Sequence, residues 1–169
     1  MYLVLACGNP LREDDGVAWR VAEALGSPGE GIEVRTVQEL GPELAEEVAE
    51  AEGVVFVDAR EGRPPGSVWC EALAASVLTN GFTHALDPPT LLLLAERLYD
   101  GAPPAALVSI SGERFGHGER ISPRVARSVP QAVSWVRRIL AGWRGQVPSW
   151  PVSSSSTRPL RSSTPDPTA

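Results

Sequence analysis

Residues 2–16 have the sequence YLVLACGNPLREDDG, an apolar run that ends in an acidic turn. Residues 2–7 are continuously apolar and stop at Gly-Asn-Pro, which predicts a buried strand. From Val17 onwards the apolar residues recur at helical spacing up to Leu25, which predicts an amphipathic helix. A buried strand that leads directly into a helix is typical of an α/β fold.

The turn between this strand and this helix carries three acids, Glu13, Asp14 and Asp15. In an open α/β sheet, ligands bind in the crevice at the carboxyl ends of the strands. A phosphate-binding turn would offer glycines and backbone N–H groups at this place, whereas carboxylates attract a cation. The turn therefore predicts a metal site.

Apolar runs and amphipathic segments alternate along the rest of the chain. Further strands are expected at residues 32–37, 53–58, 68–73 and 105–110, and further helices at 42–51, 88–98 and 122–140. Asp87 is expected to cap the helix that starts with Pro88. This order predicts a three-layer α/β sandwich with a twisted, mostly parallel five-stranded sheet and helices on both faces. Strand 68–73 is expected to be antiparallel, because only a short turn precedes it.

The composition predicts one domain and a tail. The chain has 169 residues and 43% hydrophobic content, enough for one core, which we place in residues 1–145. Residues 146–169 are rich in Ser, Pro and Thr. Such a segment buries too little apolar surface to offset the entropy of ordering, so a disordered tail is expected.

Charge and residue usage exclude several classes of protein. A net charge of −6 and a pI of about 5.0 argue against a nucleic-acid partner. The chain has no lysine, which excludes Schiff-base chemistry. Cys7 and Cys70 lie in apolar runs and are expected to be buried thiols. No signal peptide precedes the first strand and no run is long enough to span a membrane, so we expect a soluble, cytoplasmic monomer.

Two further residues are expected to join the acidic turn. Asp58 ends the apolar strand 53–58, and His84 lies in the loop before the helix that starts at Pro88. The carboxyl ends of parallel strands share one edge of the sheet, so Asp15 and Asp58 should face a common crevice. Two carboxylates and one imidazole leave positions open for water or a substrate group. This mixture suits nickel, zinc or manganese.

Each candidate in the turn has a structural alternative. Acids at a helix start commonly cap the helix and stabilise its dipole, which would account for Asp14, while Glu13 is expected to face water. For Asp15, a helix-start role and a ligand role are equally supported.

The other candidates have alternatives as well. Arg60 could pair with Asp58, whose carboxylate closes an apolar strand and needs a partner. Taken alone, His84 could be an ordinary loop histidine. The second histidine, His117, lies between two glycines, and we expect no catalytic role for it.

A covalent nucleophile is not expected. No G-x-S-x-G pattern surrounds Ser109 or Ser111, so the nucleophile of a reaction at this site would be a water activated by a metal. One of the two ligand carboxylates, or the neighbouring Asp14, could accept the proton. Asn9, fixed by Pro10, could donate to a developing oxyanion, with a structural role in the turn as the alternative.

The turn also carries a family resemblance. Residues 8–16 resemble the signature G-N-x-L-x-x-D-(D/E)-G of the [NiFe]-hydrogenase maturation endopeptidases. The resemblance continues at residues 55–59, 65–68 and 83–87, and it extends over residues 1–142. It implies that Asp15, Asp58 and His84 are the metal-binding residues of the family, which are the three that the chemistry of the residues had indicated.

The resemblance implies a cytoplasmic, metal-dependent endopeptidase. Such an enzyme removes the C-terminal extension of a [NiFe]-hydrogenase large-subunit precursor after nickel insertion. The nickel in the substrate is then the recognition handle, and zinc or cadmium could replace it in vitro. Two alternatives stay open. One is a maturation factor that binds nickel or the precursor without cutting, and the other is a Rossmann-like hydrolase of another amide or ester.

Overall fold

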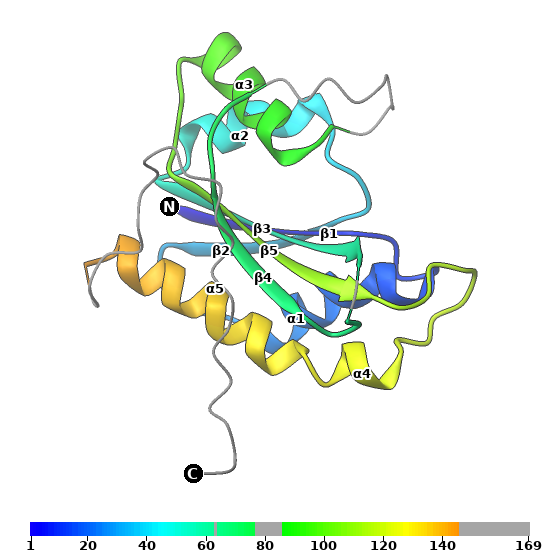
Figure 1. Cartoon of the computed structure of the whole chain (residues 1–169). Coiled ribbons are helices and arrows are strands. Elements are labelled where there is room, and N and C mark those ends of the chain that lie inside the picture. Colours follow the sequence, from blue (N-terminus) through cyan, green and yellow to red (C-terminus); the bar gives the residue numbers. More distant parts are fainter. Residues whose placement is uncertain (63, 77–85, 146–169) are drawn as a thin grey trace.

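A five-stranded sheet with the order β2-β1-β3-β5-β4 runs through the centre of the molecule (Figure 1). The computed structural model describes residues 1–62, 64–76 and 86–145. The parallel strands are β1 (Tyr2–Cys7), β2 (Ile32–Val37), β3 (Gly53–Glu61) and β5 (Ala105–Gly112). Strand β4 (Val68–Leu73) is antiparallel to β5, so the predicted fold class and the predicted antiparallel strand are both confirmed.

Helices cover both faces of the sheet (Figure 1). One face carries α1 (Val17–Leu25), α4 (Pro123–Ala126) and α5 (Val129–Trp143), and the other carries α2 (Ala45–Glu50) and α3 (Pro88–Tyr99). Two short 3-10 helices, η1 (Glu13–Gly16) and η2 (Pro42–Leu44), lead into α1 and α2. The sheet and its two helical layers form the three-layer sandwich that the sequence predicts.

Strand β1 contributes to both hydrophobic cores. Val4 and Ala6 belong to the core beneath α1 and α5, whereas Leu3 and Leu5 belong to the core beneath α2 and α3. All four side chains have 0% exposure. Alternate residues of a strand face opposite sides of the sheet, so a continuously apolar strand is the pattern expected for burial on both faces.

The last predicted helix is two helices. The sequence predicts one helix over residues 122–140, but α4 ends at Ala126 and α5 begins at Val129. Pro130 explains the break, because it has no N–H to bond the carbonyl of Ala126 and its ring would clash with that carbonyl. Proline is tolerated in the first turn of a helix, which is its place in α5.

Strand β3 is longer than predicted. The apolar run stops at Val57, yet β3 continues to Glu61 because its backbone stays paired with β5 as far as Gly112. The parallel ladder needs backbone groups and no apolar side chains, so polar residues extend it. Asp58 therefore lies within the strand, three residues before its end.

Two other predictions concern the ends of elements. Asp87 caps α3 as predicted, because its side chain accepts a hydrogen bond of 2.8 Å from Thr90 N.

The tail at 146–169 lies outside the described residues, so its disorder stays a prediction. Within the part of the chain that the structure describes, no helix has the length and apolar character needed to cross a membrane.

Candidate functional site

The strand order reverses beside β1. The chain moves from β1 to β2 on one side, then returns to pair β3 with the other side of β1. In α/β folds, such a reversal marks the place at the carboxyl ends of the strands where ligands bind. The acidic turn follows β1 here, and Asp58 lies on the neighbouring β3.

The start of the acidic turn is held by Asn9. Its backbone N–H donates to Asp15 Oδ2 at 2.9 Å, and its Oδ1 accepts from Leu11 N at 2.9 Å. Gly8 has a φ of 137°, and a Cβ on it would lie 2.0 Å from the Asp15 carbonyl oxygen, so only glycine fits. These contacts support the structural role of Asn9, while its predicted role as an oxyanion donor stays a prediction.

Asp14 is a buried structural carboxylate. Its side chain has 0% exposure and accepts hydrogen bonds from the backbone N–H groups of Glu113 (2.8 Å), Arg114 (3.0 Å) and Ser122 (2.6 Å). Burial opposes its ionisation, but the hydrogen bonds from these amides together outweigh burial and lower the pKa of Asp14.

These contacts correct two predictions about Asp14. The helix-capping prediction is wrong, because neither η1 nor α1 receives a side-chain cap. Its predicted role as a proton acceptor is also disfavoured, because a carboxylate without exposure and with a lowered pKa is a poor acceptor for a substrate proton.

Glu13 also binds the loop after β5, so the prediction that it faces water is wrong. Its Oε2 accepts from Gly116 N at 2.9 Å, and its Oε1 lies 3.7 Å from Arg114 Nε. The side chain is 18% exposed. The backbone N–H of Glu13 donates to the carbonyl of Gly118, which ties the turn to this loop a second time. His117 lies in the same loop and is exposed.

Asp58 and Asp15 lie near enough to repel each other. The pKa of Asp58 is raised to about 7: burial is the main cause, the nearby Asp15 carboxylate adds to it, and a hydrogen bond from the Ala59 amide opposes it. Asp58 in turn adds to the effect of burial in raising the pKa of the Cys7 thiol. The structure thus brings the two predicted carboxylates together at the carboxyl ends of β1 and β3. Cys7 and Cys70 are buried free thiols, as predicted.

Arg60 is not the partner of Asp58. Its guanidinium lies over the ring of Trp69, 5.4 Å from the ring centroid, and Asp58 takes part in none of the ion pairs found within the described ranges. A partly buried carboxyl with a raised pKa, close to a second carboxylate, is the donor chemistry that a divalent cation would stabilise. The pair therefore fits a metal ion.

The predicted triad is incomplete in the described chain. His84 lies outside the described residues, so its distance from Asp15 and Asp58 stays untested. Over residues 1–62, 64–76 and 86–145, no group of three His, Cys, Asp or Glu side chains could hold a metal ion. Asp15 and Asp58 are thus two candidate ligands, with His84 predicted as the third.

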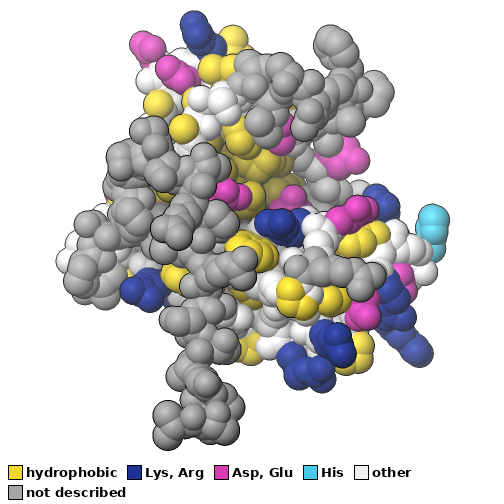
Figure 2. Space-filling view, viewed as in Figure 1, with side chains coloured by type: hydrophobic (Ala, Val, Ile, Leu, Met, Phe, Trp, Pro, Cys, Tyr) yellow, Lys and Arg dark blue, Asp and Glu magenta, His cyan; other side chains and the backbone are white. Residues whose placement is uncertain are grey.

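The surface near these carboxylates has mixed charge. In the view of Figure 1, strands β3 and β5 point their carboxyl ends towards the right. Figure 2 shows arginine and acidic side chains next to one another on that side of the same face. A substrate approaching this side meets charges of both signs.

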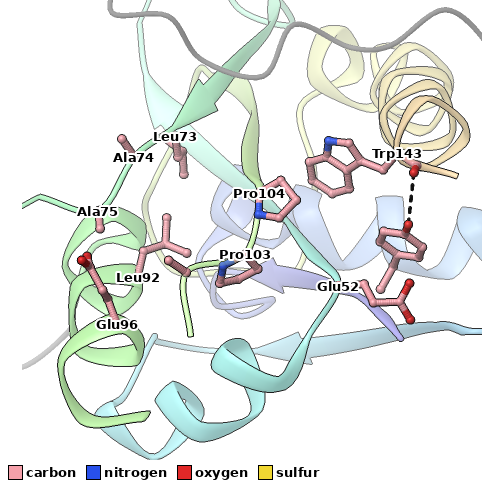
Figure 3. A pocket seen from close by; sticks show the side chains of 11 residues that line it. Glu52, Leu73, Ala74, Ala75, Leu92, Glu96, Pro103, Pro104 and Trp143 are labelled. Carbon is pink, nitrogen blue, oxygen red and sulfur yellow. Dashed lines mark hydrogen bonds between the residues drawn. The ribbon is translucent and has the colours of Figure 1, made fainter. Parts of the chain in front are cut away.

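An open pocket of about 640 Å³ lies elsewhere, at the amino ends of β1, β3 and β5 (Figure 3). Trp143 and Tyr2 line one side, with their rings stacked at a centroid distance of 6.1 Å and the Tyr2 hydroxyl donating to the Trp143 carbonyl at 3.2 Å. Most of its lining is apolar, with Glu52 and Glu96 as the acids. The pocket lies at the opposite end of the strands from Asp58, so we do not assign the predicted metal site to it.

No protein-family model matches the chain, and none of the curated proteins matches it. Solved structures do match. The hydrogenase maturating endopeptidase HybD from E. coli is 22% identical with a TM-score of 0.65, covering 85% of this chain and 93% of that one. The hydrogenase 2 maturation peptidase from Thaumarchaeota archaeon SCGC_AB-539-E09 is 24% identical with a TM-score of 0.63, covering 82% and 97%.

A third solved structure matches at a similar identity and coverage. The [NiFe] hydrogenase maturation protease HycI from Thermococcus kodakarensis is 19% identical with a TM-score of 0.67, covering 82% of this chain and 91% of that one. At these identities the matches show a shared fold. The resemblance drawn from residues 8–16 is thus confirmed at the level of the fold.

The buried Asp14 carboxylate should be essential for stability. Asp14→Asn replaces the charged acceptor of three amides and turns an NH₂ group towards N–H donors, so it should lower the free energy of unfolding by about 2–5 kcal/mol at pH 7. The pKa of Asp14 is lower in the folded chain than in the unfolded one. The difference in free energy of unfolding between wild type and Asp14→Asn should therefore shrink as the pH falls below about 4. Urea unfolding measures both effects. Glu113→Gln, at an exposed position, is the control, and equal stability of Asp14→Asn and wild type would contradict this role.

The ionised Asp58 carboxylate should destabilise the folded chain, in contrast to that of Asp14. Its folded pKa is raised, so wild-type stability should fall as the pH rises from about 4 to about 7. Asp58→Asn removes this loss and should be more stable than wild type above pH 7, by an amount on the order of 2–4 kcal/mol. Urea unfolding with a chelator at pH 5 and pH 8 measures the difference. Glu61→Gln, at the exposed end of β3, should show no such gain, and a variant that gains nothing at pH 8 would refute the burial of a charged Asp58.

Proposed function

We propose that this chain is an endopeptidase that removes the C-terminal extension of a [NiFe]-hydrogenase large-subunit precursor after nickel insertion. The observation that carries this proposal is the approach of Asp15 and Asp58 at the reversal of strand order, on the fold shared with the maturation endopeptidases. The signature of residues 8–16 forms the turn that presents Asp15. We place this processing in the cytoplasm and expect the chain to act as a monomer.

Substrate recognition follows from the charge of this site. Two carboxylates that repel each other bind a divalent cation better than they bind an uncharged peptide. Nickel already held by the precursor would bind Asp15, Asp58 and His84, and so mark a precursor that is ready for cleavage. The metal thus belongs to the substrate, and zinc or cadmium could replace it in vitro. A precursor without nickel would leave the repulsion in place and bind weakly.

The hydrolysis is proposed to use water, since the described nucleophiles are poorly placed. Burial raises the pKa of Cys7, and burial raises the pKa of Cys70 to about 12, so both thiols stay protonated. Ser109 and Ser111 are buried. Water would attack the scissile carbonyl and its proton would pass to a carboxylate, which would then give that proton to the leaving nitrogen as the C–N bond breaks, leaving a carboxylic acid and an amine. One of the two ligand carboxylates is proposed as the proton acceptor.

Processing of a precursor tests this proposal. Nickel-loaded large-subunit precursor, incubated with the purified chain, should shift to the mature mass in mass spectrometry, whereas nickel-free precursor should not. Asp15→Asn, Asp58→Asn and His84→Gln should each slow processing by about 10²–10⁴-fold or abolish it. His117→Gln is the control and should process at the wild-type rate.

Other outcomes would identify the alternatives. Binding of the nickel-loaded precursor without a change in mass would support a maturation factor that does not cut. Hydrolysis of simple esters or amides without precursor processing would support another hydrolase. Loss of processing in Ser109→Ala equal to that in His84→Gln would replace the water mechanism with a covalent one.

A further inference from the structure

Arg60 and Ser111 lie next to Asp58, further towards the carboxyl ends of β3 and β5. They are partners in the β3–β5 register, two residues after the partners Asp58 and Ser109. Alternate residues of a strand share a face, so Asp58 and Arg60 lie on the same face of β3, with Cα atoms about 7 Å apart. Arg60 and Ser111 are therefore placed to contact a substrate bound at Asp58.

The same end of the sheet also holds buried polar atoms that lack a hydrogen-bond partner. Among the residues that the structure describes, the buried side-chain polar atoms without a partner are Ser111 Oγ and Trp69 Nε1. Ser111 is 1% exposed. A buried donor without a partner costs about 1–3 kcal/mol, so native proteins rarely keep one without a reason. Trp69 pairs with Ser109 across the β4–β5 ladder, which puts both unsatisfied atoms at the same end of the sheet.

A fixed cation lies beside these atoms. The Arg60 guanidinium is held over the Trp69 ring at 5.4 Å, and Arg60 makes none of the ion pairs within residues 1–62, 64–76 and 86–145. Stacking on the indole restricts the guanidinium without neutralising its charge. Arg60 thus presents an oriented positive charge at an exposed position.

Gly62 lies beside both donors. A Cβ at this position would lie 3.2 Å from Ser111 Oγ and 3.7 Å from Arg60 Nε. The hydroxyl and the guanidinium therefore lie on the same side of Gly62, where a side chain on this residue would crowd the hydroxyl. An oxygen atom with negative charge is the group that both can donate to.

We propose that Arg60, Gly62 and Ser111 form a subsite for a carboxylate of a bound peptide. One guanidinium charge matches one carboxylate charge, and its planar fork fits the two oxygens. The spacing of about 7 Å from Asp58 corresponds to about two residues of extended peptide, at about 3.3 Å per residue. The subsite rests on the proposed function, and its peptide is the substrate cut at Asp58. Trp69 is a positioning residue that orients the guanidinium.

The indole N–H signals of the protein can test this subsite by NMR. The chain has five tryptophans, and Trp69→Phe assigns the Trp69 signal. Three probes separate the possible groups: acetyl-Ala-Ala with a free C-terminal carboxylate, acetyl-Ala-Glu-amide with a side-chain carboxylate, and acetyl-Ala-Ala-amide with none. At least one carboxylate probe should shift the Trp69 signal in a saturable way, and the neutral amide should bind at least tenfold more weakly. The tighter carboxylate probe identifies the source of the carboxylate.

Substitutions then test the assigned residues. Arg60→Gln should weaken binding of the carboxylate probe at least tenfold, and Gly62→Ala should do the same because its methyl group would crowd the Ser111 hydroxyl. Ser111→Ala should weaken binding by a smaller factor. Arg138→Gln is the matched control, since Arg138 lies over Trp135 at 5.6 Å in a similar pair on α5, and it should bind like wild type. Well-dispersed amide spectra check that each variant is folded.

Two results would overturn the subsite: equal binding of the neutral amide, or wild-type affinity of the carboxylate probe in Arg60→Gln. Binding of these probes requires no cleavage, so it is independent of precursor processing. Failure to process precursor with intact probe binding would contradict the proposed function alone. Intact processing with no carboxylate preference would contradict the subsite alone.

Discussion

The three hydrogen bonds received by the Asp14 carboxylate hold the acidic turn in place. Their donors, Glu113, Arg114 and Ser122, come from the segment between β5 and α4, which is far along the chain from η1. Backbone hydrogen bonds to Arg114 and Gly118, together with the Glu13 side chain, tie the same turn to the loop after β5. With these contacts, the turn is fixed against the end of β5, and the next residue, Asp15, lies near β3.

Asp14 and Asp58 lie at the same end of the sheet but have opposite environments. Asp14 is surrounded by N–H donors and its pKa is lowered, whereas burial and Asp15 raise the pKa of Asp58. Pairs of titratable groups whose pKa values are pushed apart are typical of catalytic sites. The fold uses the stabilised carboxylate for structure, and it retains the destabilised one where α/β proteins bind ligands. The cost in stability at Asp58 is the kind of cost expected at a functional site.

Much of the fold was predictable from local patterns. The continuously apolar run located β1 to the residue, and the alternation of apolar and polar residues located β2. Strand β4 was also located to the residue, and the short turn before it predicted its antiparallel direction. Asp87 was predictable as a cap because its partner, Thr90, is three residues away. The break before α5 was missed although Pro130 signals it, and the extra length of β3 has no apolar signal at all.

The site was predictable only in part. Topology alone brings Asp15 and Asp58 to one edge, so their approach could be predicted from residue order. The roles of Asp14 and Glu13 could not, because their partners lie about a hundred residues further along the chain and local sequence indicates a helix cap instead. Residue order left Arg60 open as an alternative partner for Asp58, but the antiparallel β4 supplies Trp69 beneath its guanidinium instead. His84 remains a predicted ligand.

The most direct test of the paired carboxylates is the pKa of Asp58, measured by carbon-13 NMR of its carboxyl carbon in chelator-treated protein. The structure predicts a pKa of about 7 in the wild-type chain. It also predicts a lower pKa for Asp58 in Asp15→Asn, because the repelling charge is gone. Titration of Asp58 near the ordinary value of about 3.9, unchanged by Asp15→Asn, would contradict the pairing of these two residues.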